Sequence, residues 1–244
     1  MTVADVLQKI SEYHDTFHGR PTRTDGVEAR NRLLAAALKL FAEKGFANTS
    51  TRQLAAAAGV NIAAISYYFG DKAGLYRAAY TEPMGGDCGN LACLDPHSMS
   101  LEEALRMMLS QIVQPLKQGE LVQLCMRLRY REMLEPTGLW AQEIDAEIRP
   151  GHEGLVAGLC LHLNVPTPDD DIHRLAHSIV GLAIYMFVGR DVVHALAPQL
   201  QATPEAIDIY TDRLVDYAMA MAASEAARRK KTSELHTITK AKQK

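Results

Sequence analysis

The sequence lacks any apolar run long enough to cross a membrane. It contains no stretch of 18 consecutive apolar residues, whereas a membrane-spanning helix needs about 20. The opening residues, MTVADVLQKISEYHD, place acids among the apolar residues and so lack the continuous apolar region of a secretory signal. We therefore expect a soluble, cytoplasmic protein with no membrane partner.

Cysteines and aromatic residues are also scarce. The four cysteines, at positions 88, 93, 125 and 160, are too irregularly spaced for a disulfide framework, so we expect free thiols in a reducing compartment. Aromatic residues make up 6% of the chain, and no sustained alternation of apolar and polar residues indicates β-strands. Hydrophobic residues, at 48%, recur instead at three- and four-residue spacing, which predicts an all-α protein with a substantial core.

Motifs for catalysis are missing as well. The sequence has no phosphate-binding glycine loop and no nucleophile elbow. His173 and His177 stand four residues apart, a spacing that can hold a metal ion, but no Glu of an HExxH pattern lies between them. We interpret both as ordinary helix histidines, leave metal binding open, and predict no catalytic residue and no cofactor. An enzyme is therefore the least favoured class.

Charge is distributed unevenly along the chain. Residues 1–80 hold 10 Lys and Arg against 7 Asp and Glu, a balance of +3, and residues 81–244 hold 16 against 22, a balance of −6. A basic N-terminal part on an acidic body suits a protein that presents one end to a polyanion.

The N-terminal part is predicted to be an arm followed by a long helix. Residues 1–27 end in HGRPTRTDG, whose Gly, Pro and Thr indicate a loop. The next segment, VEARNRLLAAALKLFAEKG, carries a helical apolar stripe that includes Leu33, Ala37 and Phe41 and ends at Gly45. The ordered domain is therefore expected to begin at residue 28.

Two short helices joined by a tight turn follow. Ser50 or Thr51 is a good N-cap for the first helix, and Gly59 interrupts the chain before the second, which begins after Asn61. Two short helices propped on a longer one form a helix-turn-helix. We expect this domain to occupy residues 28–80.

The second short helix, NIAAISYYF, has two different faces. Ile62, Ile65 and Phe69 form its expected buried stripe, because successive residues turn by about 100°. The opposite face and its flanks carry Asn61, Ala63, Ala64, Ser66, Tyr67 and Tyr68, with Lys72 following. Alanine allows close approach and can touch a thymine methyl group, while the polar side chains reach phosphates or base edges. The face suits the DNA major groove, although such helices also occur as packing surfaces for other helices.

The string LLAAALKLFAEKGFANTSTRQLAAAAGVNIAAISYYFGDKAGLY carries Phe41, Gly45, Gly59, Phe69 and Lys72 at a characteristic spacing. From Ala29 to Tyr80 the chain resembles in this way the TetR family of bacterial repressors. The resemblance implies that DNA is contacted by Thr49, Ser50, Arg52, Asn61, Ala63, Ala64, Ser66, Tyr67, Tyr68 and Lys72.

One position departs from that family pattern. Ser66 stands where many members have Tyr, so Tyr67 is expected to provide more of the contact. Arg20, Arg23 and Arg30 could add phosphate contacts from the arm, and a solvated arm is the alternative.

Residues 81–230 are predicted to be a helix bundle that binds an effector and dimerises, and residues 231–244 a polar tail. Helices are expected at 100–117, 119–134, 138–163, 169–196 and 204–228. The strings RLRYREMLEPTGLW and IVGLAIYMFVGRDVVHAL resemble the C-terminal domain of CecR-type TetR regulators. In that family the last two long helices pair with their copies in a second subunit. The resemblance implies a homodimer interface containing Ile179, Leu182, Met186, Leu214 and Tyr217, and for each single residue packing in the core of one chain is the alternative.

Soft and flat apolar side chains recur in the predicted bundle. Met adapts to irregular shapes, and Trp and Tyr offer flat apolar surface with one polar atom, so such residues suit a pocket for a small organic molecule. The candidate ligand-binding residues are Met107, Cys125, Met126, Met133, Trp140 and Tyr185, and for most of them an ordinary core position is the alternative.

Together these observations predict a ligand-responsive DNA-binding regulator. We expect a repressor that is released from a palindromic operator in double-stranded DNA by a small apolar or aromatic effector. The alternative is a helical protein-interaction module that uses Tyr67 and Tyr68 to contact another protein. The residues do not specify the operator sequence, the effector or the target genes, and activation instead of repression stays open.

Overall fold

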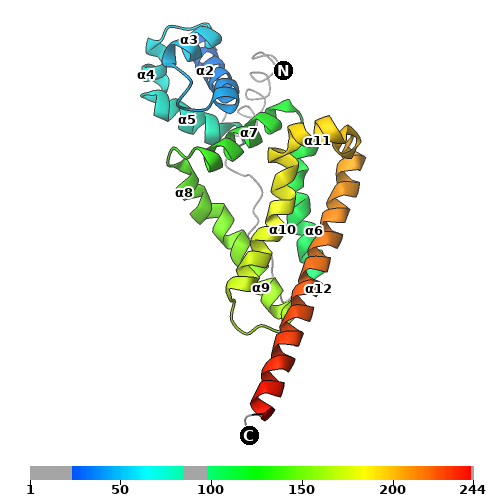
Figure 1. Ribbon diagram of the computed structural model, residues 1–244. Coiled ribbons are helices and arrows are strands. Elements are labelled where there is room, and N and C mark those ends of the chain that lie inside the picture. Colours follow the sequence, from blue (N-terminus) through cyan, green and yellow to red (C-terminus); the bar gives the residue numbers. More distant parts are fainter. Residues whose placement is uncertain (1–23, 85–97, 243–244) are drawn as a thin grey trace. The chain divides into compact units, whose positions relative to one another are not determined.

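The computed structural model describes residues 24–84 and 98–242, and every regular element in these ranges is a helix (Figure 1). The all-α prediction is therefore confirmed for this part of the chain. Two compact units are present: Met1–Cys88 with Gln118–Glu143, and Gly89–Lys117 with Ile144–Lys244. Arg20, Arg23, Cys88 and Cys93 lie outside the described residues, whereas Cys125 and Cys160 are not in a disulfide.

The first unit is built on the long helix α2. Its elements are α2 (Thr24–Lys44), α3 (Thr51–Ala58), α4 (Ala63–Phe69), α5 (Lys72–Thr81), η1 (Glu82–Met84), α7 (Glu120–Leu134) and α8 (Leu139–Glu143). Leu34, Leu38 and Phe41 are completely buried along one face of α2, where they meet Leu54 of α3 and Leu75 of α5. Helix α2 begins at Thr24, so the predicted arm of 27 residues is slightly too long.

Helix α7 packs into this first unit, although it follows the predicted domain boundary at residue 80. Leu121, Cys125 and Leu128 belong to the same buried cluster as the core residues of α2 and α5. The unpatterned stretch after α5 indicates a joint between domains, but the sequence alone does not show that the chain later returns to this core. The compact units therefore divide differently from the predicted domains.

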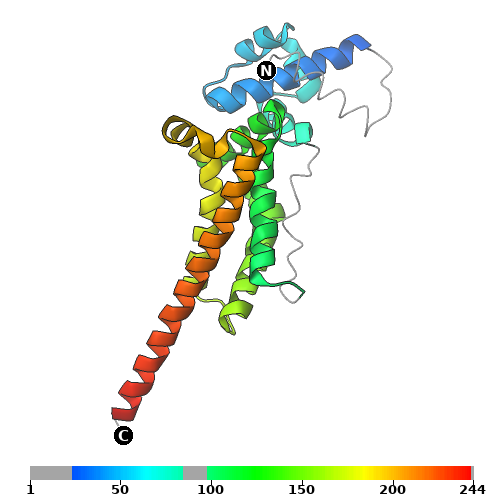
Figure 2. The same ribbon diagram turned by 90° about the vertical axis from the view of Figure 1, so that its right-hand side faces the viewer.

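The second unit is a helix bundle. Its elements are α6 (Leu101–Val113), η3 (Gln114–Lys117), the π-helical turn η4 (Ile144–Ile148), α9 (Arg149–Leu163), α10 (Asp170–Val188), α11 (Arg190–Leu196), η5 (Pro198–Gln201) and α12 (Pro204–Lys242). Leu105 and Leu109 of α6 pack with Ile179 of α10 and Val215 of α12 in a shared core. Figure 2 shows α12 running beside α6 and continuing past its end.

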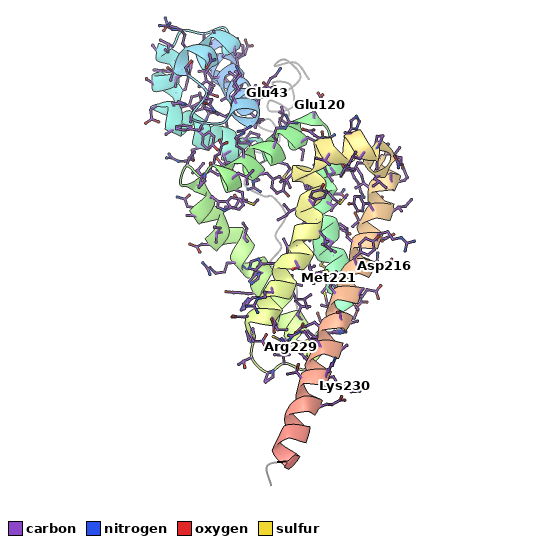
Figure 3. All side chains as sticks on the ribbon, viewed as in Figure 1. Glu43, Glu120, Asp216, Met221, Arg229 and Lys230 are labelled. Carbon is purple, nitrogen blue, oxygen red and sulfur yellow. The ribbon has the colours of Figure 1, made fainter. Side chains whose placement is uncertain are left out.

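Charged contacts attach the middle of α12 to the start of α10. Asp169 caps α10 by accepting hydrogen bonds from the amides of Asp171 and Ile172. The same carboxylate accepts two hydrogen bonds from Arg229, at 2.7 and 2.8 Å. Arg229, which is labelled on α12 in Figure 3, also donates to Glu225. This bidentate pair fixes the position of α12 beside the N-terminus of α10.

Helix α10 ends at Gly189, where the chain bends by 70° into α11. A Cβ at Gly189 would lie 2.6 Å from the ring of Tyr185, so the Tyr185 ring would have to move to accommodate a larger residue there. Among the described residues, no single helix has the length and apolar content to cross a membrane; α10 and α11 meet those criteria only when counted together across their bend.

Candidate DNA-binding surface

Local hydrogen bonds define the first short helix of the helix-turn-helix. Ser50 and Gln53 form a capping box: the Ser50 hydroxyl accepts from the Gln53 amide, and the Gln53 side chain accepts from the Ser50 amide. Such reciprocal caps satisfy amide groups that have no partner inside the helix. Gly59 ends α3 in the left-handed conformation, with φ of 63°, which glycine adopts without strain.

The second short helix is fixed at both ends. The side chain of Asn61 accepts a hydrogen bond from the amide of Ala63 at 2.9 Å, as predicted for a cap. Gly70 ends α4, and Asp71 caps α5 by accepting from the amide of Gly74 at 2.7 Å. A side chain at Gly74 would lie 1.9 Å from the carbonyl oxygen of Phe69, so the close junction of α4 and α5 requires glycine.

These caps hold one face of α4 open to solvent. Tyr67 is 82% exposed, and Asn61, Ala63 and Ser66 are exposed with it. Ile65, on the opposite face, is buried. Ser50 and Arg52 at the start of α3 are exposed too. Six of the ten residues implied by the family resemblance, with Tyr67 counted among them, are therefore exposed on α4, next to it at Asn61, or at the start of α3.

Three of the implied contact residues have structural roles. Thr49 is buried, and its hydroxyl donates to the carbonyl of Gly45 at 2.8 Å, so the prediction of a DNA contact for it is wrong. Ala64 and Tyr68 are half-buried and pack against the core of the first unit, because α4 turns them toward α2. They contribute less to the open face than the sequence predicts.

Ile62 differs from its prediction in the opposite direction. It precedes the first turn of α4 and is 48% exposed, so it does not belong to the buried stripe with Ile65. Sequence periodicity misplaced it because the helix begins one residue later than the apolar pattern. The open face therefore carries an apolar side chain beside its small and aromatic ones.

Two basic residues near this face, Lys72 and Arg30, contact other side chains of the first unit. The Lys72 ammonium lies 4.2 Å from the centre of the Phe46 ring, and partial burial lowers the pKa of Lys72. Arg30 donates two hydrogen bonds to Glu82, at 2.7 and 3.0 Å, and stacks over Phe69. Arg30 thus joins α2 to η1, and the prediction of a phosphate contact from it is not supported by its position.

A buried carboxylate supports the helix that follows α4. Glu132 of α7 has no exposed surface and accepts a 2.6 Å hydrogen bond from the hydroxyl of Tyr76 on α5. It also accepts from the Thr137 amide and hydroxyl and from the Trp140 amide. Burial and the Glu132 hydrogen bond raise the pKa of Tyr76, which keeps its hydroxyl protonated as the donor. Sequence reasoning missed Glu132; its position among the apolar residues of α7 was the available signal.

The predicted ligand-binding residues are divided between the two units. Cys125 is buried in the core of the first unit, and Met126, Met133 and Trp140 are half-buried there. Met107 and Tyr185 belong to the second unit, where they are 41% and 48% exposed. The structure does not bring these six side chains together within either unit.

The predicted dimer residues also have different environments. Ile179, Met186 and Leu214 are buried in the core of one chain, so the prediction that they contact a partner is wrong. The apolar stripes that contain these residues pack against other helices of the same chain. Leu182 is half-buried and Tyr217 is 53% exposed, which leaves these two available to a partner.

Sequence comparisons match both parts of the chain. Residues 33–79 match the bacterial regulatory proteins of the tetR family, and residues 101–224 match the C-terminal domain of the HTH-type transcriptional dual regulator CecR. CecR of Shigella flexneri is 29% identical over 179 residues, which cover 69% of this chain and 79% of that protein. The probable HTH-type transcriptional regulator YttP of Bacillus subtilis is 43% identical over 56 residues, 23% of this chain and 27% of that protein.

Solved structures share the fold at lower identity. HlyIIR, a hemolysin II transcriptional regulator, has a TM-score of 0.50 and 22% identity, covering 73% of this chain and 97% of that one. A tetR-family regulator from Streptomyces coelicolor has a TM-score of 0.50 and 20% identity, covering 88% and 89%. With a helix-turn-helix open to solvent and a CecR-type match over just over half its length, the chain belongs to the TetR family of DNA-binding transcriptional regulators.

Proposed function

We propose that the protein is a homodimeric repressor that binds a palindromic operator through two copies of the α3–α4 surface. The observation that carries the proposal is the open face of α4, where Tyr67 is 82% exposed above the buried Ile65. Small neighbours, Ala63 and Ser66, let the helix backbone approach a groove closely. Two such surfaces would read two half-sites and double the phosphate contacts of a weakly basic domain.

The second copy would bind the outward face of α10 and α12. On α10, Tyr185 and Val188 are 48% and 50% exposed, and on α12, Ile209 and Tyr217 are 65% and 53% exposed. Tyr210, next to Ile209 on α12, is half-buried against the core of the second unit, and this burial raises its pKa. An apolar face of this kind is unusual on a monomer and suits a self-complementary interface.

The effector in this proposal is a small apolar or aromatic molecule. Met126, Met133 and Trp140 offer adaptable and flat apolar surface on α7 and α8, beside the Glu132 network that holds α5. A ligand that binds here would act on DNA affinity only by favouring one of two conformations over the other. A relative is named a dual regulator. Activation of transcription at some promoters is therefore the alternative to repression.

Selection of bound DNA tests the proposal. Random duplexes retained by the pure protein would be sequenced, and the best one footprinted. We expect two protected half-sites related by two-fold symmetry, with centres separated by about one helical turn or a multiple of it. A single asymmetric half-site, or no enrichment over unselected duplexes, would contradict the dimeric operator model.

A second candidate function follows from the exposed pair Ile62 and Tyr67. Their apolar surface could bind another protein instead of DNA. Salt dependence separates the two: operator affinity falls steeply with salt because bound counterions are released, whereas a largely apolar protein contact changes little.

A further inference from the structure

One large apolar side chain of the helix-turn-helix faces solvent although a core that could bury it lies next to it. Ile62, in the turn that leads into α4, is 48% exposed. Val60 before it and Ala64 after it both pack against the buried cluster of the first unit. The chain therefore turns Ile62 away from that core, which leaves its side chain available to a partner.

The backbone at Ile62 is fixed by hydrogen bonds on both sides. The Ala63 amide donates to the side chain of Asn61 at 2.9 Å, and the Ala64 amide donates to the Asn61 carbonyl, also at 2.9 Å. The Ile62 carbonyl accepts from the Ile65 amide at 3.1 Å. A β-branched side chain is restricted in its first torsion as well. Ile62 therefore presents its methyl groups in a nearly fixed position, and binding costs it little conformational entropy.

The surroundings of Ile62 suit the groove of a nucleic acid better than another protein. The exposed residues beside it on the motif are small or polar: Asn61, Ala63 and Ser66. Arg52 is exposed at the start of α3. The core of a protein–protein interface is depleted of charged residues and needs a wider apolar patch than this one. Duplex DNA is therefore the partner that this surface fits.

An isoleucine side chain can recognise only one feature of a base pair in the major groove. All four bases present hydrogen-bond donors or acceptors there, and thymine alone adds an apolar methyl group at C5. Isoleucine has no side-chain donor or acceptor, so at any other base it would displace water from a polar edge without replacing the hydrogen bond. Contact with a thymine methyl group loses no hydrogen bond and removes apolar surface from water.

On the premise of the operator binding proposed above, we propose that Ile62 selects a thymine in each operator half-site by covering its 5-methyl group. Burial of one methyl group corresponds to about a fourfold gain in affinity. Two copies of the protein would bind two half-sites that lie far apart. Removal of the methyl group from both should therefore weaken binding by about 15-fold, because distant effects add in free energy.

Exchange of thymine for deoxyuridine tests this contact, because it removes the 5-methyl group and keeps every donor and acceptor of the base. The operator selected by the full-length protein would be synthesised with deoxyuridine at one thymine position at a time, in both half-sites together. Fluorescence anisotropy at one fixed salt concentration gives the dissociation constants, since affinity for DNA depends on salt. We expect at least one position at which the exchange weakens wild-type binding by about 15-fold.

Variants connect that methyl group to Ile62. Ile62→Ala should bind the thymine and deoxyuridine operators equally well, and it should melt as the wild type does because Ile62 is turned away from the core. Ile62→Val keeps the branched side chain and should keep most of the preference for thymine. Leu134→Ala is the matched control, since Leu134 is a 71% exposed aliphatic residue on α7 of the same unit. Its affinities for both operators should equal those of the wild type.

Three results would overturn the thymine contact while operator binding stands. The selected half-sites could share no thymine, no deoxyuridine exchange could weaken wild-type binding, or the sensitive position could stay equally sensitive in Ile62→Ala. A selected site with a single half would leave the contact measurable, with an expected effect of about fourfold. Retention of no DNA by the pure protein would overturn operator binding and the thymine contact together, and would favour the protein-binding role of Ile62 and Tyr67.

Discussion

The hydroxyl of Tyr76 lies 2.6 Å from the fully buried carboxylate of Glu132. Tyr76 belongs to α5, which follows α4 directly, and Glu132 belongs to α7. The hydrogen bond thus joins α5 to α7 through two residues that lie 56 positions apart in sequence. A charge-assisted hydrogen bond in a buried site fixes relative position more strongly than a neutral one.

The first prediction concerns this bond. Tyr76→Phe should lower the free energy of unfolding by about 1.5–3 kcal/mol, because the substitution removes a hydrogen bond to a charged group and keeps the ring. Urea unfolding measures the change. Tyr67→Phe is the matched control, since the Tyr67 hydroxyl is on the exposed face, and it should change stability by less than about 0.5 kcal/mol. Equal effects of the two substitutions would show that the buried bond is not a significant contact.

The second prediction tests whether the exposed Tyr67 serves operator binding and not the stability of the fold. Tyr67→Ala should weaken operator binding by about 1–3 kcal/mol, because an aromatic contact with the groove or a phosphate is lost. Its melting temperature should match that of the wild type. Gel shifts and melting curves on the same samples measure both quantities. Unchanged operator affinity would remove Tyr67 from the proposed surface.

Thr49→Val should have the opposite effects to Tyr67→Ala: lower stability and unchanged operator affinity. Thr49 is buried, and its hydroxyl donates to the Gly45 carbonyl. Stability should fall by about 1 kcal/mol, as for a lost internal hydrogen bond, while the folded variant binds operator as the wild type does. Weaker operator binding by the fully folded Thr49→Val variant would restore Thr49 to the contact set.

Periodicity predicted the helices and the open face of α4, because local spacing determines which side chains share a helix face. The buried Ile65 and exposed Tyr67 lie as expected. Thr49 was misassigned because its hydroxyl bonds to a carbonyl four residues earlier, a contact that spacing does not reveal. Glu132 was missed because a charged side chain on a helix is normally exposed.

Long-range packing was the least predictable feature. Ile179, Met186 and Leu214 were predicted at a dimer interface, yet the bundle of a single chain buries them. An apolar stripe indicates burial without specifying the partner that covers it. The return of α7 to the first unit was unpredicted for the same reason.

The third prediction concerns the junction of α4 and α5. Gly74→Ala should disrupt this junction, because the new methyl group would lie 1.9 Å from the Phe69 carbonyl oxygen, a backbone atom. We expect a loss of at least about 1–3 kcal/mol of stability, as for other overpacked sites. Ala73→Ser, at the exposed neighbouring position, is the control and should be nearly neutral. Wild-type stability in Gly74→Ala would mean that the two helices are less closely joined than described.

The fourth prediction tests the outward face of α10 and α12. Ile209→Asp should convert the proposed dimer to a folded monomer, because a charge would be placed in an apolar interface. Leu214→Asp should instead unfold the chain, since Leu214 is buried within the protomer. Light scattering and circular dichroism distinguish these outcomes. Ala202→Asp, at an exposed position before α12, should remain dimeric. A wild-type monomer, or a dimer that persists in Ile209→Asp, would exclude this interface.

The last prediction concerns the attachment of α12 to α10 and its dependence on pH. Hydrogen bonds from Arg229, and then from the Ile172 amide, lower the pKa of Asp169 well below its usual range. A lowered pKa in the folded state means that the unfolded chain takes up the proton first as pH falls. The stability contributed by Asp169 is therefore fully present above the ordinary carboxyl pKa and is lost as pH falls through the lowered value.

Asp169→Asn should melt at a lower temperature than the wild type at pH 7, and the difference should shrink in strong acid. Asp170→Asn is the matched control, because the Asp170 carboxylate is exposed and pairs with Arg174 one turn away on the same helix. Because such exposed pairs contribute little, its melting temperature should stay near that of the wild type. A pH-independent difference for Asp169→Asn would show that its effect comes from packing or capping geometry and not from the charge that binds Arg229.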